Sequence, residues 1–113
     1  MSTIKIEFHH FVAENKVKER SRLLLKELAH EHKTLISDLK EEWNGNEGKF
    51  NFLINKKNIS GKINSNSHPV INIEIEIPFQ LFLLRSNIKK MIQNKMNQVY
   101  WYDQSKKYQF KTL

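Results

Sequence analysis

The sequence predicts an α+β fold: an antiparallel β-sheet with two helices packed on one face, in the order β-α-β-β-β-β-α. Isoleucines alternate with polar residues over 71–77, a period typical of a strand with one buried face. Pro78, which cannot donate to a sheet ladder, ends that strand. Beyond Pro78 the period changes, which predicts an amphipathic helix starting there. The stripe of this helix consists of Leu84, Ile88, Met91 or Ile92, Lys95 and Val99.

The first strand and the first helix are predicted from the N-terminal third of the chain. Ile4, Ile6 and Phe8 alternate with polar residues, so residues 3–9 are expected to form a strand. Over residues 13–32 the apolar positions recur at helical spacing and charged residues occupy the positions between them. This pattern predicts a helix, which Glu and Lys pairs at helical spacing support modestly.

Three more strands are expected before the isoleucine-rich strand. Residues 34–43 fit a helix and a strand equally well, because their large apolar residues satisfy both periods. The Asn44-Gly45 pair is a strong hairpin signal and favours a loop followed by a strand near 38–43. Alternation predicts further strands over 50–54 and 59–63. Short polar turns indicate an antiparallel meander, which the first strand joins at its edge or centre.

Length and composition restrict the class of protein. The 113 residues predict one α+β domain over 1–102, followed by a polar and aromatic C-terminal tail over 103–113. The chain has no cysteine, which excludes disulfides and thiolate sites. No apolar run reaches the roughly 18 residues that a transmembrane helix needs, and the first residues lack a secretory signal. We therefore expect a cytoplasmic protein without a transmembrane segment.

The positive charge is concentrated near the C-terminus. Residues 79–113 hold seven Lys or Arg and one acid (7 − 1 = +6), out of a net charge of +7. Interleaved cations and aromatic rings can bind nucleic acid through phosphates and stacked bases. They also suit an anionic lipid or polymer surface, and a solvated helix face is the third interpretation. The candidate partner-binding surface consists of Arg85, Lys89, Lys90, Lys95, Tyr100, Trp101, Tyr102, Lys106 and Lys107.

The histidines do not predict a metal site. His9 and His10 are neighbours on a strand, so their side chains should point to opposite faces. His30 and His32 lie about 200° apart around a helix and cannot easily share an ion. We therefore expect neither a metal nor a cofactor.

Catalytic patterns are also missing from the sequence. It contains no nucleophile elbow and no cysteine. Glu74 and Glu76 should lie on one face of a strand, where a cross-strand ion-pair ladder with Lys62 or similar residues is a simpler interpretation than an acid–base pair. The sequence leaves an enzymatic role open but favours a non-enzymatic one.

Several segments resemble the small polyhydroxyalkanoic acid system proteins, also called polyhydroxyalkanoate granule-region proteins. The matching segments are IKIEFHH, VKERSRLLLKELAHEH, EEWNGN, the S-G-x-I strand at 60–63 and IEIPFQLFLLRSNIKKMIQNKM. The resemblance covers residues 3–99. It implies that His10, with His9 as the alternative, matches the family's histidine. It also implies that Gly61 matches a strand glycine needed for close backbone packing or a bulge.

The resemblance implies a small bacterial accessory protein of storage-polyester synthesis or use, with the polyester granule surface as its expected partner. The alternative is a basic RNA- or ribosome-associated protein, because ribosome-hibernation factors share the order strand, helix, meander, helix. A third interpretation is an interaction module that forms a homodimer through an exposed sheet edge.

Overall fold

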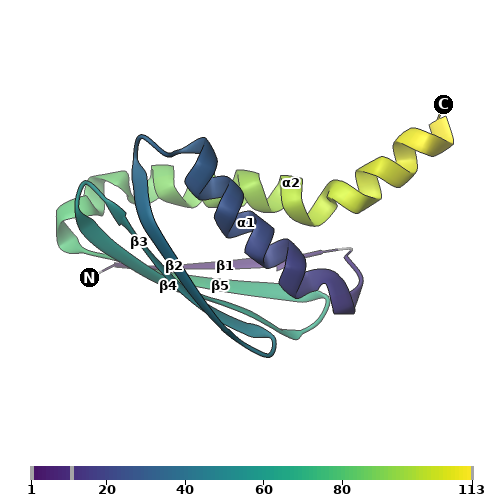
Figure 1. The fold of residues 1–113 in the computed structure, drawn as a ribbon, viewed down its shortest axis with the longest axis horizontal. Coiled ribbons are helices and arrows are strands. Elements are labelled where there is room, and N and C mark those ends of the chain that lie inside the picture. The colour runs from purple at the N-terminus through teal and green to yellow at the C-terminus, as the bar shows by residue number, and fades with distance from the viewer. Residues whose placement is uncertain (1, 11, 113) are drawn as a thin grey trace.

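The computed structural model describes residues 2–10 and 12–112, and their side chains as far as residue 100 (Figure 1). Five strands form one antiparallel sheet in the order β1-β5-β4-β3-β2. The predicted α+β class and element order are therefore confirmed. The elements are β1 (Ser2–His9), η1 (Glu14–Lys16), α1 (Val17–Glu31), β2 (Ile36–Asn44), β3 (Glu47–Ile54), β4 (Lys57–Ser67), β5 (Val70–Ile77), η2 (Phe79–Leu84) and α2 (Arg85–Thr112), where η marks a 3-10 helix.

The core lies between the sheet and the two helices. Figure 1 shows both helices crossing the same side of the sheet. The isoleucines of β5 are fully buried, and the register places Ile73 between Ile6 of β1 and Ile63 of β4. Such a continuous β-branched face explains why β5 is the central element of the hydrophobic core. The helices cover it with Leu24, Leu25, Leu28, Ile88, Ile92 and Met96.

The ambiguous residues 34–43 form most of strand β2, as the hairpin signal favoured. Gly45 has a positive φ of 62° and begins a two-residue loop that joins β2 to β3. Hydrogen bonding to β3 selects the strand over the helix for this segment, because a helix would use its backbone groups internally and could not pair with β3. The strand starts earlier than expected, at Ile36, and is interrupted by a bulge where Asp38 has φ 55°.

The second helix does not begin at Pro78. Pro78 adopts an extended conformation, and a 3-10 segment intervenes before α2 begins at Arg85. The backbone of α2 continues to Thr112, so residues 103–112 belong to the same helix, whose end runs past the sheet in Figure 1. The division of the chain into a domain and a tail stays a prediction. Among the described residues, no helix is both long and apolar enough to cross a membrane.

Candidate functional site

Three large apolar side chains are exposed where β5 turns into α2. They are Phe79, Phe82 and Leu83, with exposed fractions of 83%, 58% and 92%. We call this cluster the apolar corner. Within the described side chains these three are the large hydrophobic residues that the fold leaves exposed. A cluster of this kind on a small domain indicates a contact surface.

The geometry of η2 explains why the corner faces outward. A 3-10 helix has three residues per turn, so positions three apart lie on the same side. Leu81 is buried and Leu84 is half-buried, whereas Phe79 and Phe82, also three apart, point away from the core. The Leu81 N–H donates to the Pro78 carbonyl at 2.9 Å, which closes the first turn. One side of η2, with Leu81 and Leu84, therefore anchors the segment, while the other two sides present Phe79 and Phe82 on one and Leu83 on the other.

Arg85, which follows the corner directly, ties it to the start of the sheet. Its Nε donates to Ser2 Oγ at 2.7 Å, and one terminal nitrogen donates to the Thr3 carbonyl at 3.2 Å. A guanidinium with two fixed acceptors positions the beginning of α2 against β1. The sequence predicts a partner contact for Arg85, whereas in the structure this residue makes contacts inside the molecule.

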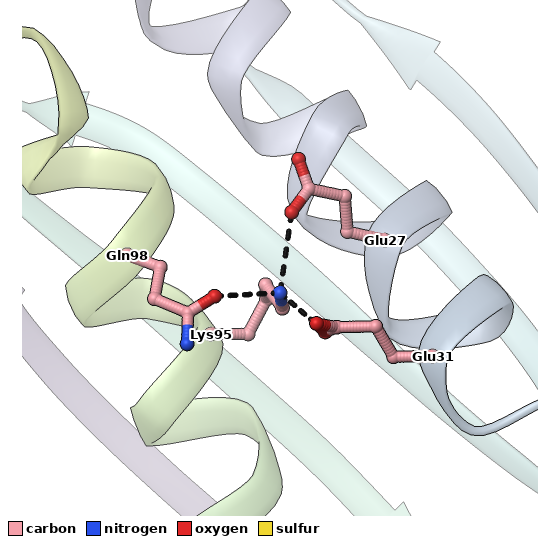
Figure 2. Close-up of polar contacts among 4 residues, drawn as sticks. All are labelled: Glu27, Glu31, Lys95 and Gln98. Atoms are coloured by element: carbon pink, nitrogen blue, oxygen red, sulfur yellow. Dashed lines mark hydrogen bonds and ion pairs between the residues drawn. The ribbon is translucent and has the colours of Figure 1, made fainter.

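Lys95 also makes internal contacts, because it lies between the two helices. Its ammonium group contacts Glu27 at 3.2 Å and Glu31, both on α1, and donates to Gln98 at 2.7 Å (Figure 2). The residue is only 3% exposed, while both carboxylate side chains are nearly half exposed. A buried ammonium with three oxygen partners links α1 to α2 and cannot reach an external partner in this fold.

The Lys95 ammonium and the Glu31 carboxylate both stay charged around neutral pH. Burial alone would lower the pKa of Lys95, but the hydrogen bonds that its ammonium donates to Glu31 and Glu27 outweigh this effect and the pKa is raised. The hydrogen bond from Lys95 in turn lowers the pKa of Glu31. Both shifts favour the charged forms, so the ion pair is intact at neutral pH.

Tyr100 lies in the core instead of on a surface. Its side chain has no exposed area, and its hydroxyl is 2.7 Å from the hydroxyl of Ser21 on α1. Burial raises the pKa of the Tyr100 phenol, so this group stays protonated. The tyrosine is a second polar link between the helices, next to Phe8 of β1.

His10 lies beside Tyr100, with the ring centroids 5.9 Å apart, and is 3% exposed. Its Nδ1 accepts a hydrogen bond from the Val12 N–H at 3.2 Å, while its Nε2 has no partner among the described residues. The ring meets that of His68 edge-on, with the centroids 4.7 Å apart. Burial, followed by the proximity of His68, lowers the pKa of His10. His10 is therefore a neutral, packed histidine that closes the end of the sheet.

Gly61 permits close packing in the middle of the sheet. It faces Phe50 across β3 and β4, and a side chain at this position would collide with the Phe50 ring and lie 2.9 Å from the Glu74 carbonyl. The register is unbroken at Gly61, so of the two roles considered the structure favours close packing over a bulge.

The remaining candidate residues are placed as follows. Lys90 is exposed and Lys89 is half-buried, both on the first turns of α2 after the apolar corner. The side chains of Trp101, Tyr102, Lys106 and Lys107 lie outside the described residues, so their assignment stays a prediction. The structure thus brings Lys89 and Lys90 near the corner and places Lys95, Tyr100 and His10 in the interior.

The outer face of the sheet carries charges of both signs. A hollow of about 500 Å³ lies over it, lined among others by Lys49, Lys62 and Glu74. The register places Lys62 directly opposite Glu74, and Lys5 contacts Glu74 at 4.0 Å. This matches the expected ladder of cross-strand charges, and it gives the hollow no dominant sign that would select a ligand. Within the described part of the chain, no three His, Cys, Asp or Glu residues are grouped to hold a metal ion.

The apolar corner is not among the residues that the sequence pattern selects. That pattern predicts that the run PFQLFLLR begins an amphipathic helix, in which its large residues would be expected to pack inward. A signal is nevertheless present, because five apolar residues in six cannot all face one side of a helical segment.

Fold and surface together define a two-layer α+β protein with an exposed apolar corner. A family model described as "Putative polyhydroxyalkanoic acid system protein" matches residues 4–100. The chain belongs to this family. Neither a curated protein nor a solved structure matches the chain.

Proposed function

We propose that this protein is a non-enzymatic, cytoplasmic accessory protein of bacterial storage-polyester metabolism that adsorbs to the granule surface through the apolar corner. The observation that carries the proposal is the exposure of Phe79, Phe82 and Leu83. Family membership supports the polyester context, since the matching model is described as a polyhydroxyalkanoic acid system protein.

The chemistry of the corner suits a polymer surface better than a small ligand. Burying a Phe or Leu side chain is worth about 1.5–3 kcal/mol, so three such side chains can hold a protein of this size on an apolar phase. Small ligands are held in concave pockets, whereas the corner projects from the two outward sides of a short 3-10 segment. A convex apolar cluster can insert into a deformable polyester layer without a pocket.

The lysines after the corner suit the edge of such a contact. Lys89 and Lys90 follow η2 by one turn of α2 and retain exposure to solvent. Cations beside an apolar cluster favour an interface that carries negative groups, including polymer chain ends or acidic lipid. Arg85 and Lys95 are engaged inside the molecule, which reduces the number of cations available for the alternative partner, RNA.

The proposal is tested by binding the full chain to isolated polyester granules, anionic vesicles and RNA in parallel. The variant Phe79→Ser/Phe82→Ser/Leu83→Ser removes the corner. Its affinity for granules should fall at least about a hundredfold, because several kcal/mol of apolar burial are lost. Its melting temperature should not fall, since the three side chains are exposed and Leu81 keeps the anchor of η2.

The matched charge variant is Lys89→Gln/Lys90→Gln. It should weaken granule binding only a few-fold, and this loss should disappear at high salt because the cations are exposed. Granule binding by the corner variant at the wild-type level would refute the proposal. Tight RNA binding that depends on Lys89 and Lys90, without granule binding, would replace it with the RNA-associated alternative.

A further inference from the structure

The two edges of the sheet differ in a way that points to self-association. At one edge, β2 is interrupted by a bulge between Ser37 and Lys40, with Asp38 in a left-handed conformation. At the other edge, all eight residues of β1 stay in unbroken register with β5. Bulges protect an edge strand from pairing with another chain, and a regular edge is open to it.

The backbone groups along the free side of β1 can be assigned. In an antiparallel pair the N–H and C=O of one residue point to the same side, and successive residues alternate. The Thr3 carbonyl accepts from Arg85, and the His10 N–H donates to Pro69 at the end of β5. The odd-numbered residues Thr3, Lys5, Glu7 and His9 therefore present their backbone groups outward.

We propose that β1 pairs antiparallel with β1 of a second copy of this chain, with Ile6 on the two-fold axis, to form a continuous ten-stranded sheet. Hydrogen-bonded pairs must then join odd-numbered residues of the two copies. This register joins Thr3 to His9 of the second copy and Lys5 to Glu7 of the second copy. The two-fold axis repeats each of these pairs, so each occurs two times in the dimer. All four outward residues are used, and the Thr3 carbonyl, which already accepts from Arg85, takes the second bond with its other lone pair.

Charge selects this register over its neighbours. Shifting the axis to residue 5 would place the two Lys5 side chains opposite each other, and shifting it to residue 7 would oppose the two Glu7 side chains. With the axis at Ile6, two opposite-charge pairs form on the outer face, where these side chains are exposed. On the helix face, Phe8, which is only half-buried at the edge, would meet Ile4 of the second copy.

The inference goes beyond granule binding and does not depend on it. It is tested on the purified full chain by size-exclusion chromatography with light scattering over a range of concentrations. Wild-type protein should have twice the mass of one chain. Glu7→Lys places a lysine opposite each Lys5 and should raise the dimer dissociation constant at least about tenfold. Glu7 faces Asn72 on β5, so this change leaves the Lys5–Glu74 contact within the subunit intact.

Two further variants make the result specific. The exchange Lys5→Glu/Glu7→Lys restores the complementary pairs between the copies and should recover most of the dimer affinity, although it removes the exposed Lys5–Glu74 contact within the subunit. Glu42→Lys makes the same change of charge on the opposite edge strand, β2, and should leave the dimer unaffected. A monomeric wild-type protein, or a dimer weakened by Glu42→Lys and not by Glu7→Lys, would overturn the proposal.

The register has its own test, since the chain has no cysteine. Hydrogen-bonded antiparallel residues have Cα atoms about 5.5 Å apart, which a disulfide can span. A mixture of Thr3→Cys and His9→Cys chains should therefore cross-link under mild oxidation. Either variant alone should not, because the introduced thiols of two identical chains would lie at opposite ends of the strand pair. Cross-linking of a single variant with itself, without the mixed product, would contradict this register.

Discussion

The apolar corner and the middle of α2 invert the usual distribution of side chains. In the corner, Phe79 and Leu83 are more than four-fifths exposed, whereas further along the chain Lys95 and Tyr100 are almost completely buried. Apolar groups gain by leaving water, and buried polar groups are tolerated only with partners. Lys95 has three oxygen partners and Tyr100 has Ser21, so the interior of this region is chemically satisfied.

This difference separates a structural role from a binding role, which the amino-acid composition does not distinguish. The buried polar residues hold α1 against α2, and the exposed apolar residues remain without a partner in the monomer. The first role predicts effects on stability with little direct effect on binding. The second predicts effects on binding with little effect on stability. Substitutions in the two regions should therefore behave in opposite ways.

The largest contrast is expected between Tyr100→Ala and Phe82→Ala. Truncating buried Tyr100 should lower the unfolding free energy by about 3–5 kcal/mol, since it leaves a cavity and an unpaired Ser21 hydroxyl. Truncating Phe82 should change it by less than about 0.5 kcal/mol, because that ring is exposed. Urea denaturation followed by circular dichroism measures both. Equal losses in the two variants would remove the distinction between the regions.

A second contrast concerns the link made by Lys95. Glu27→Ala/Glu31→Ala leaves a buried ammonium without its carboxylates and should cost about 2–3 kcal/mol, because the lysine stem must strain to reach water. Lys95→Met removes the buried charge and keeps the volume, and should cost less than about 1 kcal/mol, since the two glutamates can turn into solvent. The same urea denaturation experiment measures the loss of unfolding free energy in both variants. A larger loss in Lys95→Met would show that the ammonium itself is essential to the contact.

The smallest expected effect is a pH dependence from His10, which lies beside Tyr100. Burial and His68 lower its pKa below the ordinary value of 6.5. As pH falls below about 6.5, the unfolded chain therefore gains a proton that the folded chain does not yet bind. The stability contributed by neutral His10 is present above this pH and is lost as pH falls toward the folded-state pKa. Between pH 7.5 and 5 the melting temperature of wild type should therefore fall relative to that of His10→Phe, and parallel curves would contradict the assignment.

The fold was predictable because its signals are local and repeated. The alternating isoleucines of β5 and the hairpin signal at Asn44-Gly45 each determine a period or a turn without help from distant residues. The 3-10 segment after Pro78 was not predictable in the same way. Its apolar residues satisfy a helical stripe, and only the packing of Leu81 decides which of them face inward.

The candidate site was predictable in part. The period placed Lys95 on the buried stripe of the last helix, whereas its charge suggested a surface residue, and the period was the better guide. The carboxylates that make its burial possible come from α1, so no local pattern around Lys95 could identify them. The same holds for Tyr100 and Ser21, which meet only through the packing of the two helices.

Hydrogen exchange of the full chain on polyester particles tests the central claim most directly. The account predicts slower amide exchange over residues 79–83 in the bound protein than in the free protein, because adsorption would exclude water from η2. Exchange over residues 14–20 should be unchanged, since η1 and the start of α1 follow the end of β1 that lies away from Arg85. Unchanged exchange at the corner in particle-bound protein, with slower exchange elsewhere, would contradict the claim that the apolar corner is the binding surface.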